Sequence, residues 1–397
     1  MNAKIYTKKK PLVVAISITL LATSNIAIAS EVLVHPNTQW QPIADGESHT
    51  INDAKPGDRY ILINGRIEHT SFSGTSNLTV NEGMLKNSAE SRDNIFNDTS
   101  TATITQGRSI GDTFSNSAGQ FLGWEHNDTL EAVNSFDGEY HDDAYQIAYT
   151  NSESQGNQFF DNTKQWITDD AQSMQNSFSG NSSQVLTQGD KTNAAGPSST
   201  DDNFSGSSRQ LASGTGDILR AIFTDSARQE LAGAAQSKQG SFSKQSVQSI
   251  GDGSESINDK FFDSASQTVH NGGSATGTTF SGNASQVLED GAKSENTTFN
   301  GNASGIVGAN AQMLGNTTLN GSSLLSVIAQ DASHGFPNSQ QLNNVIINND
   351  STMLIAPTGS AAHLVRAGNI TLNGGTIAFG HDKGSEYTAL SAKEVNG

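Results

Sequence analysis

Three pairs of adjacent aspartates are the residues best suited to chemistry in this 397-residue sequence. They are Asp142-Asp143, Asp169-Asp170 and Asp201-Asp202. Clustered carboxylates can act as general acid and base in cleaving a polysaccharide, or they can bind calcium. Both uses require carboxylates from different stretches of the chain to meet. The pairs lie about 27 and 32 residues apart, so the period of the fold decides whether they do.

A stretch rich in histidine and aromatic residues surrounds the first pair. It holds His126 and His141, and its aromatic residues are Trp124, Tyr140, Tyr145 and Tyr149. The spacing matches no known pattern of metal ligands. We interpret the stretch as a widened segment with exposed aromatic rings that could contact a glycan or a protein partner.

Other reactive motifs give no stronger signal. The chain has no cysteine, which excludes thiolate chemistry and disulfides. Ser, His and Asp occur throughout, but without a nucleophile elbow they do not indicate a hydrolase, and we find no phosphate-binding glycine loop. We therefore predict no catalytic, cofactor-binding or metal-binding residue and no cofactor.

Composition excludes most other classes of protein. Only 16% of residues are charged and 34% are hydrophobic, with 39 glycines. Such a chain cannot close a large core of helices, so it is either disordered or a repetitive β structure with a thin shared core. The net charge is −18, from 22 Lys and Arg against 40 Asp and Glu. An acidic surface argues against nucleic acid or an anionic membrane as partner.

Residues 1–29 have the features of a Sec signal peptide. Lys4 and the lysines at 8–10 precede a short apolar run over 12–21, and Ala27-Ile28-Ala29 resembles a cleavage site. The apolar run is well short of the roughly 20 residues that a membrane-spanning helix needs. Removal of residues 1–29 takes away four lysines and leaves 18 basic against 40 acidic residues, a net charge of −22.

The remaining sequence repeats. Residues 177–186 (SFSGNSSQVL) and 279–288 (TFSGNASQVL) are nearly identical. We predict anchor positions of this repeat at Phe72, Phe96, Phe114, Phe136, Phe160, Phe178, Phe204, Phe223, Phe242, Phe262, Phe280, Phe299 and Leu319. The steps are about 18 to 20 residues from Phe204 onward and up to about 26 earlier, where we expect loop insertions.

One repeat reads as one coil of a β-solenoid. Residues 296–299 alternate so that Phe299 faces a core, and Gly180-Asn181 supplies residues that tolerate positive φ at a turn. The pattern does not decide whether Val287 or Leu288 is buried. Stacking would place each Phe about 4.8 Å from the next, with Asn, Ser and Thr ladders along the outer faces. The evenly spaced Phe residues weigh against disorder, and the aspartate pairs, which are not one coil apart, are expected to be solvated turn residues.

The repeat wording resembles the passenger domains of AIDA-type autotransporter adhesins. Residues 268–279 (TVHNGGSATGTT) match the glycine-rich phrase of that family. Residues 31–36 are similar to the start of such passengers, and residues 370–379 to the entry of their pertactin-like segment. The resemblance implies a right-handed parallel β-helix, a C-terminal outer-membrane barrel, roles in aggregation, biofilm and host adhesion, and glycosylation of Ser or Thr in some members.

These observations predict an all-β protein, a right-handed parallel β-helix with coils of about 19 residues. We divide it into a signal peptide (1–29), a repeat β-helix passenger (30–330) and the start of a pertactin-like segment (331–397), and we expect a barrel to be missing after Gly397. The predicted function is that of a non-enzymatic surface adhesin that binds identical passengers on neighbouring cells, or host glycans and proteins. The alternative is a secreted β-helix enzyme that degrades polysaccharides; a tailspike-like structural solenoid is opposed by the signal peptide.

Overall fold

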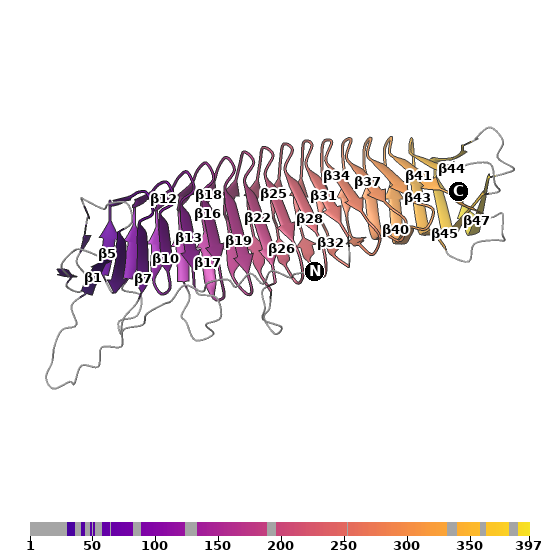
Figure 1. Ribbon diagram of the computed structural model, residues 1–397. Helices are drawn as coiled ribbons and strands as arrows, with labels where there is room; N and C mark the ends of the chain where they lie inside the picture. The colour runs from indigo at the N-terminus through magenta and orange to yellow at the C-terminus, as the bar shows by residue number, and fades with distance from the viewer. Residues whose placement is uncertain are drawn as a thin grey trace, which may run out of the picture.

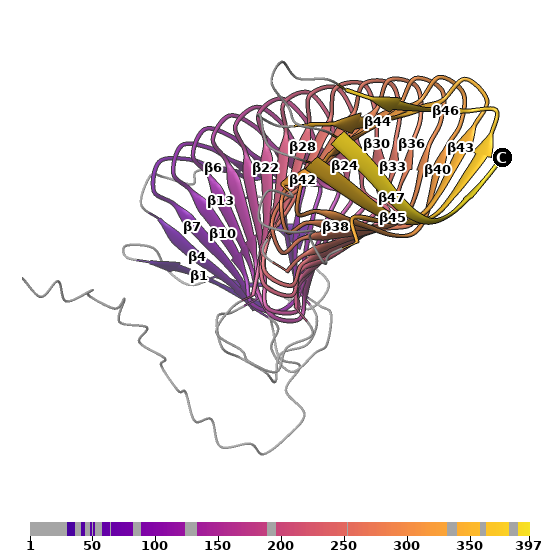
Figure 2. The same cartoon turned by 90° about the vertical axis from the view of Figure 1, so that its right-hand side faces the viewer.

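The protein folds into a long curved rod of stacked β-coils (Figure 1). The computed structural model describes residues 30–35, 41–43, 48–49, 51, 58–63, 65–81, 89–123, 133–188, 196–251, 253–331, 340–357, 363–380 and 388–397. Every regular element in these ranges is a strand. Successive coils follow a curved path, as Figure 2 shows. The predicted all-β parallel β-helix is confirmed.

Two sheets run the length of the rod. Sheet A contains β1 (Ser30–His35), β2 (Gln41–Ile43), β4 (Arg59–Ile63), β7 (Asn77–Asn81), β10 (Thr101–Ile104), β13 (Gly119–Leu122), β16 (Tyr145–Ala148), β19 (Lys164–Thr168), β22 (Ser183–Thr187), β25 (Arg209–Ala212), β28 (Arg228–Leu231), β31 (Val247–Ile250), β34 (Ser266–Val269), β37 (Ser285–Leu288), β39 (Ser304–Val307), β41 (Leu324–Ile328), β44 (Thr352–Ala356) and β46 (Thr376–Phe379). Its strands are parallel except at the start, where β1 pairs antiparallel with β2 and β4.

Sheet B receives two short strands from most coils, joined by a bend. The first column is β3 (Ser48–His49), β5 (Gly65–Glu68), β8 (Ala89–Arg92), β11 (Arg108–Ile110), β14 (Val133–Phe136), β17 (Ser152–Gln155), β20 (Gln172–Met174), β23 (Ser198–Thr200), β26 (Asp217–Leu219), β29 (Gln236–Lys238), β32 (Glu255–Ile257) and β35 (Ser274–Thr276). The second is β6 (Ser71–Phe72), β9 (Ile95–Phe96), β12 (Thr113–Phe114), β15 (Glu139–Tyr140), β18 (Gln158–Phe159), β21 (Ser177–Phe178), β24 (Asn203–Phe204), β27 (Ile222–Phe223), β30 (Ser241–Phe242), β33 (Lys260–Phe261) and β36 (Thr279–Phe280).

Toward the C-terminus the two sheet B strands of a coil join into one. These longer strands are β38 (Lys293–Phe299), β40 (Gln312–Leu319), β43 (Leu342–Asn348), β45 (His363–Asn373) and β47 (Thr388–Asn396), and the short β42 (Gln330–Asp331) pairs antiparallel with β45. The cross-section of the rod therefore changes at β38. The predicted domain boundary at 330/331 stays a prediction, and the predicted signal peptide at 1–29 lies outside the described residues.

A column of stacked aromatic rings fills one side of the interior. Neighbouring rings lie nearly parallel, with centroids 4.5 to 5.2 Å apart, as one strand spacing requires. The column is Phe72, Phe96, Phe114, Tyr140, Phe159, Phe178, Phe204, Phe223, Phe242, Phe261, Phe280 and Phe299, and the buried Leu319 pairs with Phe299 in the next coil.

Three of the predicted anchors are wrong. Phe159 and Phe261 are the buried residues of their doublets, and the predicted anchors beside them, Phe160 and Phe262, face outward. Tyr140 takes the place predicted for Phe136. In the two doublets the pleat turns adjacent residues to opposite faces, so an error of one residue moves an aromatic ring from inside to outside. Phe136 instead ends the first sheet B strand of its coil, whereas the ring column is formed by the second strand.

The corrected anchors give a regular period. Equivalent glutamines in neighbouring coils lie 19 residues apart in most steps, as from Gln146 to Gln165, and 26 apart from Gln120 to Gln146 and from Gln184 to Gln210. The extra residues follow sheet A strands, after Leu122 of β13 and after Thr187 of β22. The predicted insertions are therefore confirmed and fall at the same corner of the coil.

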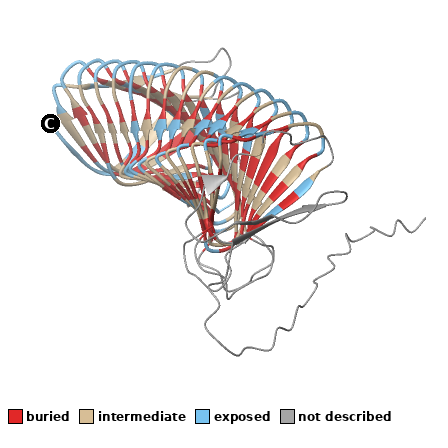
Figure 3. Ribbon diagram, turned by 90° about the vertical axis from the view of Figure 1, so that its left-hand side faces the viewer, coloured by how far each residue is buried: buried red, intermediate tan, exposed pale blue. Residues whose placement is uncertain are grey.

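Turn chemistry also follows the prediction. Gly180 and Gly282 adopt φ of 67° and 74° at the turn that leads into sheet A, and Asp142 and Asp161 hold the same turn at 58° and 52°. Glycine, Asn and Asp are the residues that tolerate this conformation. Figure 3 shows exposed residues gathered along these turns and buried ones along the strands. Among the described residues there is no helix able to cross a membrane.

The Phe doublet at 261–262 provides a matched test of this core. Replacing buried Phe261 by Ala removes a ring from the column and should cost about 3–5 kcal/mol in the free energy of unfolding. Phe262 is 38% exposed, and Phe262→Ala should cost under about 1 kcal/mol. Urea unfolding of both variants measures the difference. A larger loss for Phe262→Ala would contradict the register.

Candidate functional site

A continuous column of glutamines runs inside the rod beside the aromatic column. From Gln146 onward, each side chain donates from Nε2 to Oε1 of the glutamine in the preceding coil at 2.7 to 2.8 Å. The members are Gln120, Gln146, Gln165, Gln184, Gln210, Gln229, Gln248, Gln267 and Gln286, all buried. Because the amides from Gln146 to Gln267 both donate and accept along the rod axis, the column satisfies polar groups that would otherwise be costly to bury.

The position of this column shows which of Val287 and Leu288 is buried. On β37, Gln286 and Leu288 face the interior and Val287 faces outward. Sequence reasoning noted Gln before apolar residues but did not place it inside, because an amide is usually a surface group. Its recurrence at the coil period was the signal.

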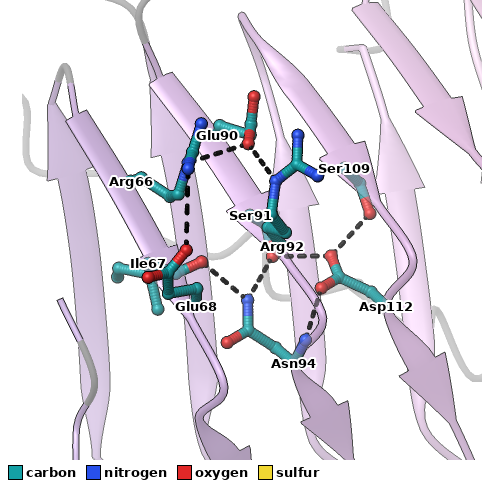
Figure 4. A network of polar contacts seen from close by, with 9 residues as sticks. All are labelled: Arg66, Ile67, Glu68, Glu90, Ser91, Arg92, Asn94, Ser109 and Asp112. Carbon is teal, nitrogen blue, oxygen red and sulfur yellow. Dashed lines mark hydrogen bonds and ion pairs between the residues drawn. The ribbon is translucent and has the colours of Figure 1, made fainter. Parts of the chain in front are cut away.

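Three buried aspartates lie at the bend between the sheet B strands. Asp112 accepts from the hydroxyls of Ser91 and Ser109 at 2.6 Å each and from the backbone N–H of Asn94 at 2.8 Å (Figure 4). Outside the same strands, Arg66 and Arg92 pair with Glu90 at 2.9 and 2.6 Å. Asp112 thus belongs to an interior hydrogen-bond network separate from the surface ion pairs.

Asp202 and Asp259 repeat this arrangement. Asp202 accepts from Ser173 at 2.5 Å and from Gln184 at 2.7 Å, and Asp259 accepts from Gln248 at 2.7 Å and Ser256 at 2.8 Å. Burial, which disfavours the charged form, raises the pKa of all three carboxyl groups, that of Asp112 to about 6, while the hydrogen bonds partly oppose the shift.

The three predicted aspartate pairs lie at three different corners of the coil. The pair at 142–143 is exposed on the turn before sheet A, and the pair at 169–170 lies just after sheet A. At the third, Asp201 forms an ion pair with Arg220 at 2.7 Å while Asp202 is buried. The prediction that the pairs do not stack is confirmed. The prediction that they are all solvated is wrong for Asp202 and for Asp169, because alternation turns one member inward.

The predicted aromatic stretch is divided between the inside and the outside of the rod. Tyr140 is buried in the ring column and donates to Gln120 Oε1 at 2.5 Å, so its expected exposure is wrong. His141 stacks on Phe160 with ring centroids 4.8 Å apart. Tyr145 faces outward from sheet A and packs edge-on against Phe121 at 5.6 Å. Trp124 and His126 lie outside the described residues.

No group of three or more histidine, aspartate or glutamate residues in the described ranges could hold a metal ion. What the rod offers instead is an extended outer surface. Over β36 and the C-terminal parts of β38 and β40, sheet B carries uncharged polar side chains on its outer side. We call this the Thr–Asn face: Thr279, Ser281, Thr298, Asn300, Thr318 and Asn320.

Asparagine ladders continue this surface toward the C-terminus. Asn320 donates to Asn300 at 2.9 Å, Asn348 to Asn320 at 2.6 Å and Asn373 to Asn348 at 2.9 Å. The predicted outer ladders are confirmed for asparagine. They extend the surface of amide and hydroxyl groups along the rod.

The glutamine column makes a testable contribution to stability. Gln229→Ala removes the donor to Gln210 Oε1 at 2.8 Å and the acceptor of Gln248 Nε2 at 2.7 Å. The free energy of unfolding should fall by about 1–3 kcal/mol because a buried acceptor loses its partner. Gln245 is exposed on a turn, and Gln245→Ala, measured in the same urea titration, should change little. Equal losses would show that the column contributes nothing specific.

The buried aspartates should make the rod more stable in acid. A carboxyl group whose pKa is raised on folding contributes its full stabilisation of the fold at pH values below its unfolded pKa, near 3.8. For Asp112 that contribution is lost as the pH rises through about 6. The free energy of unfolding of Asp112→Asn, measured relative to wild type, should therefore be higher at pH 8 than at pH 4 by about 3 kcal/mol. Asp143→Asn, on the exposed turn, removes the same charge without this gain. If the stability of wild type and of Asp112→Asn changed equally between pH 4 and pH 8, the raised pKa of Asp112 would be contradicted.

Comparison with known proteins adds evidence on the fold. Neither the protein-family models nor the curated proteins contain a match to this sequence. Among solved structures, the chain is similar to a TibC-catalysed hyper-glycosylated fragment of TibA, residues 55–350, with a TM-score of 0.52 and 12% identity over 87% of this chain and 98% of that fragment. At this identity the likeness establishes that the two chains share the solenoid fold.

Proposed function

We propose that this chain is the surface-exposed passenger of an autotransporter adhesin, which binds cells to one another by lateral association of rods. The resemblance of residues 268–279 to AIDA-type repeats supports this proposal. So does the solenoid fold that the chain shares with the TibA fragment. Export by residues 1–29 and anchoring by a barrel encoded beyond Gly397 belong to the same proposal.

The observation that carries the proposal is the Thr–Asn face. The mature chain has a net charge of −22, so two rods repel each other over most of their surfaces. The Thr–Asn face has no charged side chain, and its hydroxyl and amide groups repeat at one strand spacing. Two such faces can exchange many weak hydrogen bonds, whose sum gives avidity without a pocket.

A binding role is favoured over the alternative of a polysaccharide-degrading enzyme. Hydrolysis by paired carboxylates needs two of them facing one substrate across adjacent coils. The three aspartate pairs lie at three different corners, and the buried Asp112, Asp202 and Asp259 point into the interior. Host glycans or proteins are further partners that an adhesin surface of this kind could bind.

Cells that display the chain on an outer-membrane anchor should clump and settle. Thr279→Glu, Thr298→Glu and Thr318→Glu together place three carboxylates on the Thr–Asn face, and settling should be abolished by charge repulsion. Clumping should also weaken at low ionic strength, where repulsion between rods is less screened.

The matched control adds the same charge on another face. Ser266, Ser285 and Ser304 form an outward column of sheet A in the same coils. The triple Glu variant there should still clump. If wild-type cells never settle at any salt concentration, or if both triple variants behave alike, the proposed face is wrong.

A further inference from the structure

We propose that the outer side of sheet A between β13 and β28 binds an extended acidic polysaccharide. The site is separate from the Thr–Asn face and does not depend on self-association. It consists of an aromatic strip (Phe121, Tyr145, Ile147, Trp166, Val185 and Leu211) and a basic column (Lys164, Arg209 and Arg228) beside it. Figure 1 shows β13, β16, β19, β22 and β25 following one another along the rod.

The aromatic strip contains the longest run of large apolar side chains in its column of sheet A. Phe121, Ile147, Trp166, Val185 and Leu211 pair in sequence across five consecutive strands, all facing outward. The same column carries threonine on β7 and β10, at Thr79 and Thr103, and glutamate and serine on β28 and β31, at Glu230 and Ser249. Large apolar side chains that are partly exposed and adjacent are typical of a binding surface.

The rings of the strip are fixed in place. The Tyr145 ring lies over β13 at Gly119, where an added Cβ would come within 2.2 Å of the ring. From there it meets Phe121 and Trp166 edge-on, with ring centroids 5.6 and 6.3 Å apart. Gly119 thus supplies the room for Tyr145, and the three aromatic residues form a pre-organised platform that loses little entropy on binding.

Basic side chains occupy one outward column of sheet A in this region. Lys164, Arg209 and Arg228 are exposed on the outward position of sheet A at the start of β19, β25 and β28. Arg209 pairs with Glu230. Within the described residues no ion pair involves Lys164 or Arg228. Lys164 on the same strand as Trp166, and Arg228 three strands further along the rod, favour an anionic ligand with apolar faces.

The shape of the site indicates a linear polymer of sugars. The strip spans five strands, about 19 Å along the rod axis at one strand spacing per coil. Pyranose rings present apolar C–H faces that stack on aromatic rings, and their length in an extended chain is close to one strand spacing. Uronic acid carboxylates can reach Lys164 and Arg228 on the neighbouring column. Nucleic acid also stacks and is anionic, but its denser charge is repelled by the acidic rod.

Affinity electrophoresis of the purified passenger tests this site, with polygalacturonate as the acidic probe, dextran as the neutral one and oligo-dT as the nucleic acid. Wild type should be retarded by polygalacturonate alone. Trp166→Ala should weaken that binding about tenfold or more, which corresponds to about 1.4 kcal/mol, and Trp166→Phe should retain part of it. Lys164→Gln with Arg228→Gln should weaken it and reduce its salt dependence.

Ile306→Ala is the matched control, because Ile306 is 44% exposed in the same outward column further along the rod. It should bind like wild type, and far-ultraviolet circular dichroism should show all variants folded. Equal retardation of wild type and Trp166→Ala, no retardation of wild type, or equal binding of dextran or oligo-dT would overturn the proposal. The Glu variants of the Thr–Asn face should bind polygalacturonate like wild type. A failure of cells to clump would therefore not affect the test of this polysaccharide site.

Discussion

Contact between one coil and the next is the interaction on which the whole rod depends. A single coil buries one ring, one glutamine, an aliphatic side chain such as Ile250 and a few small side chains, which is too little for a core of its own. The partner of each interior group is its equivalent in the neighbouring coil. The Phe223 ring stacks on Phe204 and Phe242 at 4.7 Å, and Gln229 accepts from Gln248 and donates to Gln210. Stability and register are therefore properties of the array.

The polar columns add specificity that rings alone would not provide. A column of rings tolerates small shifts, since stacking is weakly directional. A glutamine column requires each amide to meet the next within hydrogen-bond distance, which fixes the register of every coil. At the bend between the two sheet B strands, some coils bury a carboxylate where other coils bury a neutral amide. Asn94, Asn157 and Asn176 occupy the same bend as Asp112 and Asp202 without a charge to bury.

The repeat made the fold predictable. The alternation of inward and outward residues limited how precisely single side chains could be placed. Phe178 and Phe280 are each the single phenylalanine of a clear repeat. These repeats predict the coil, its turn glycines and its outer asparagine ladders. The doublets at 159–160 and 261–262 offer two phenylalanines to one inward position, and no local pattern chooses between them. Gln286 and Asp202 were missed as interior groups because a polar residue is buried only when a partner in another coil satisfies it. That partner is invisible until the coils are stacked.

The outer surface was the least predictable part, for the same physical reason. Since the interior columns supply the stability, the outward positions can change from coil to coil without disturbing the fold. Phe121 and Glu230 share one column, yet their strands are alike inside, with Gln120 and Leu122 buried on one and Gln229 and Leu231 on the other. Function on such a rod is set by which outward residues occur in consecutive coils. The aromatic strip over β13–β25 and the uncharged face over β36–β40 are two such runs, on different sheets and at different distances along the axis. One rod can therefore present two surfaces of different chemistry, each of which extends only as far as its run of coils.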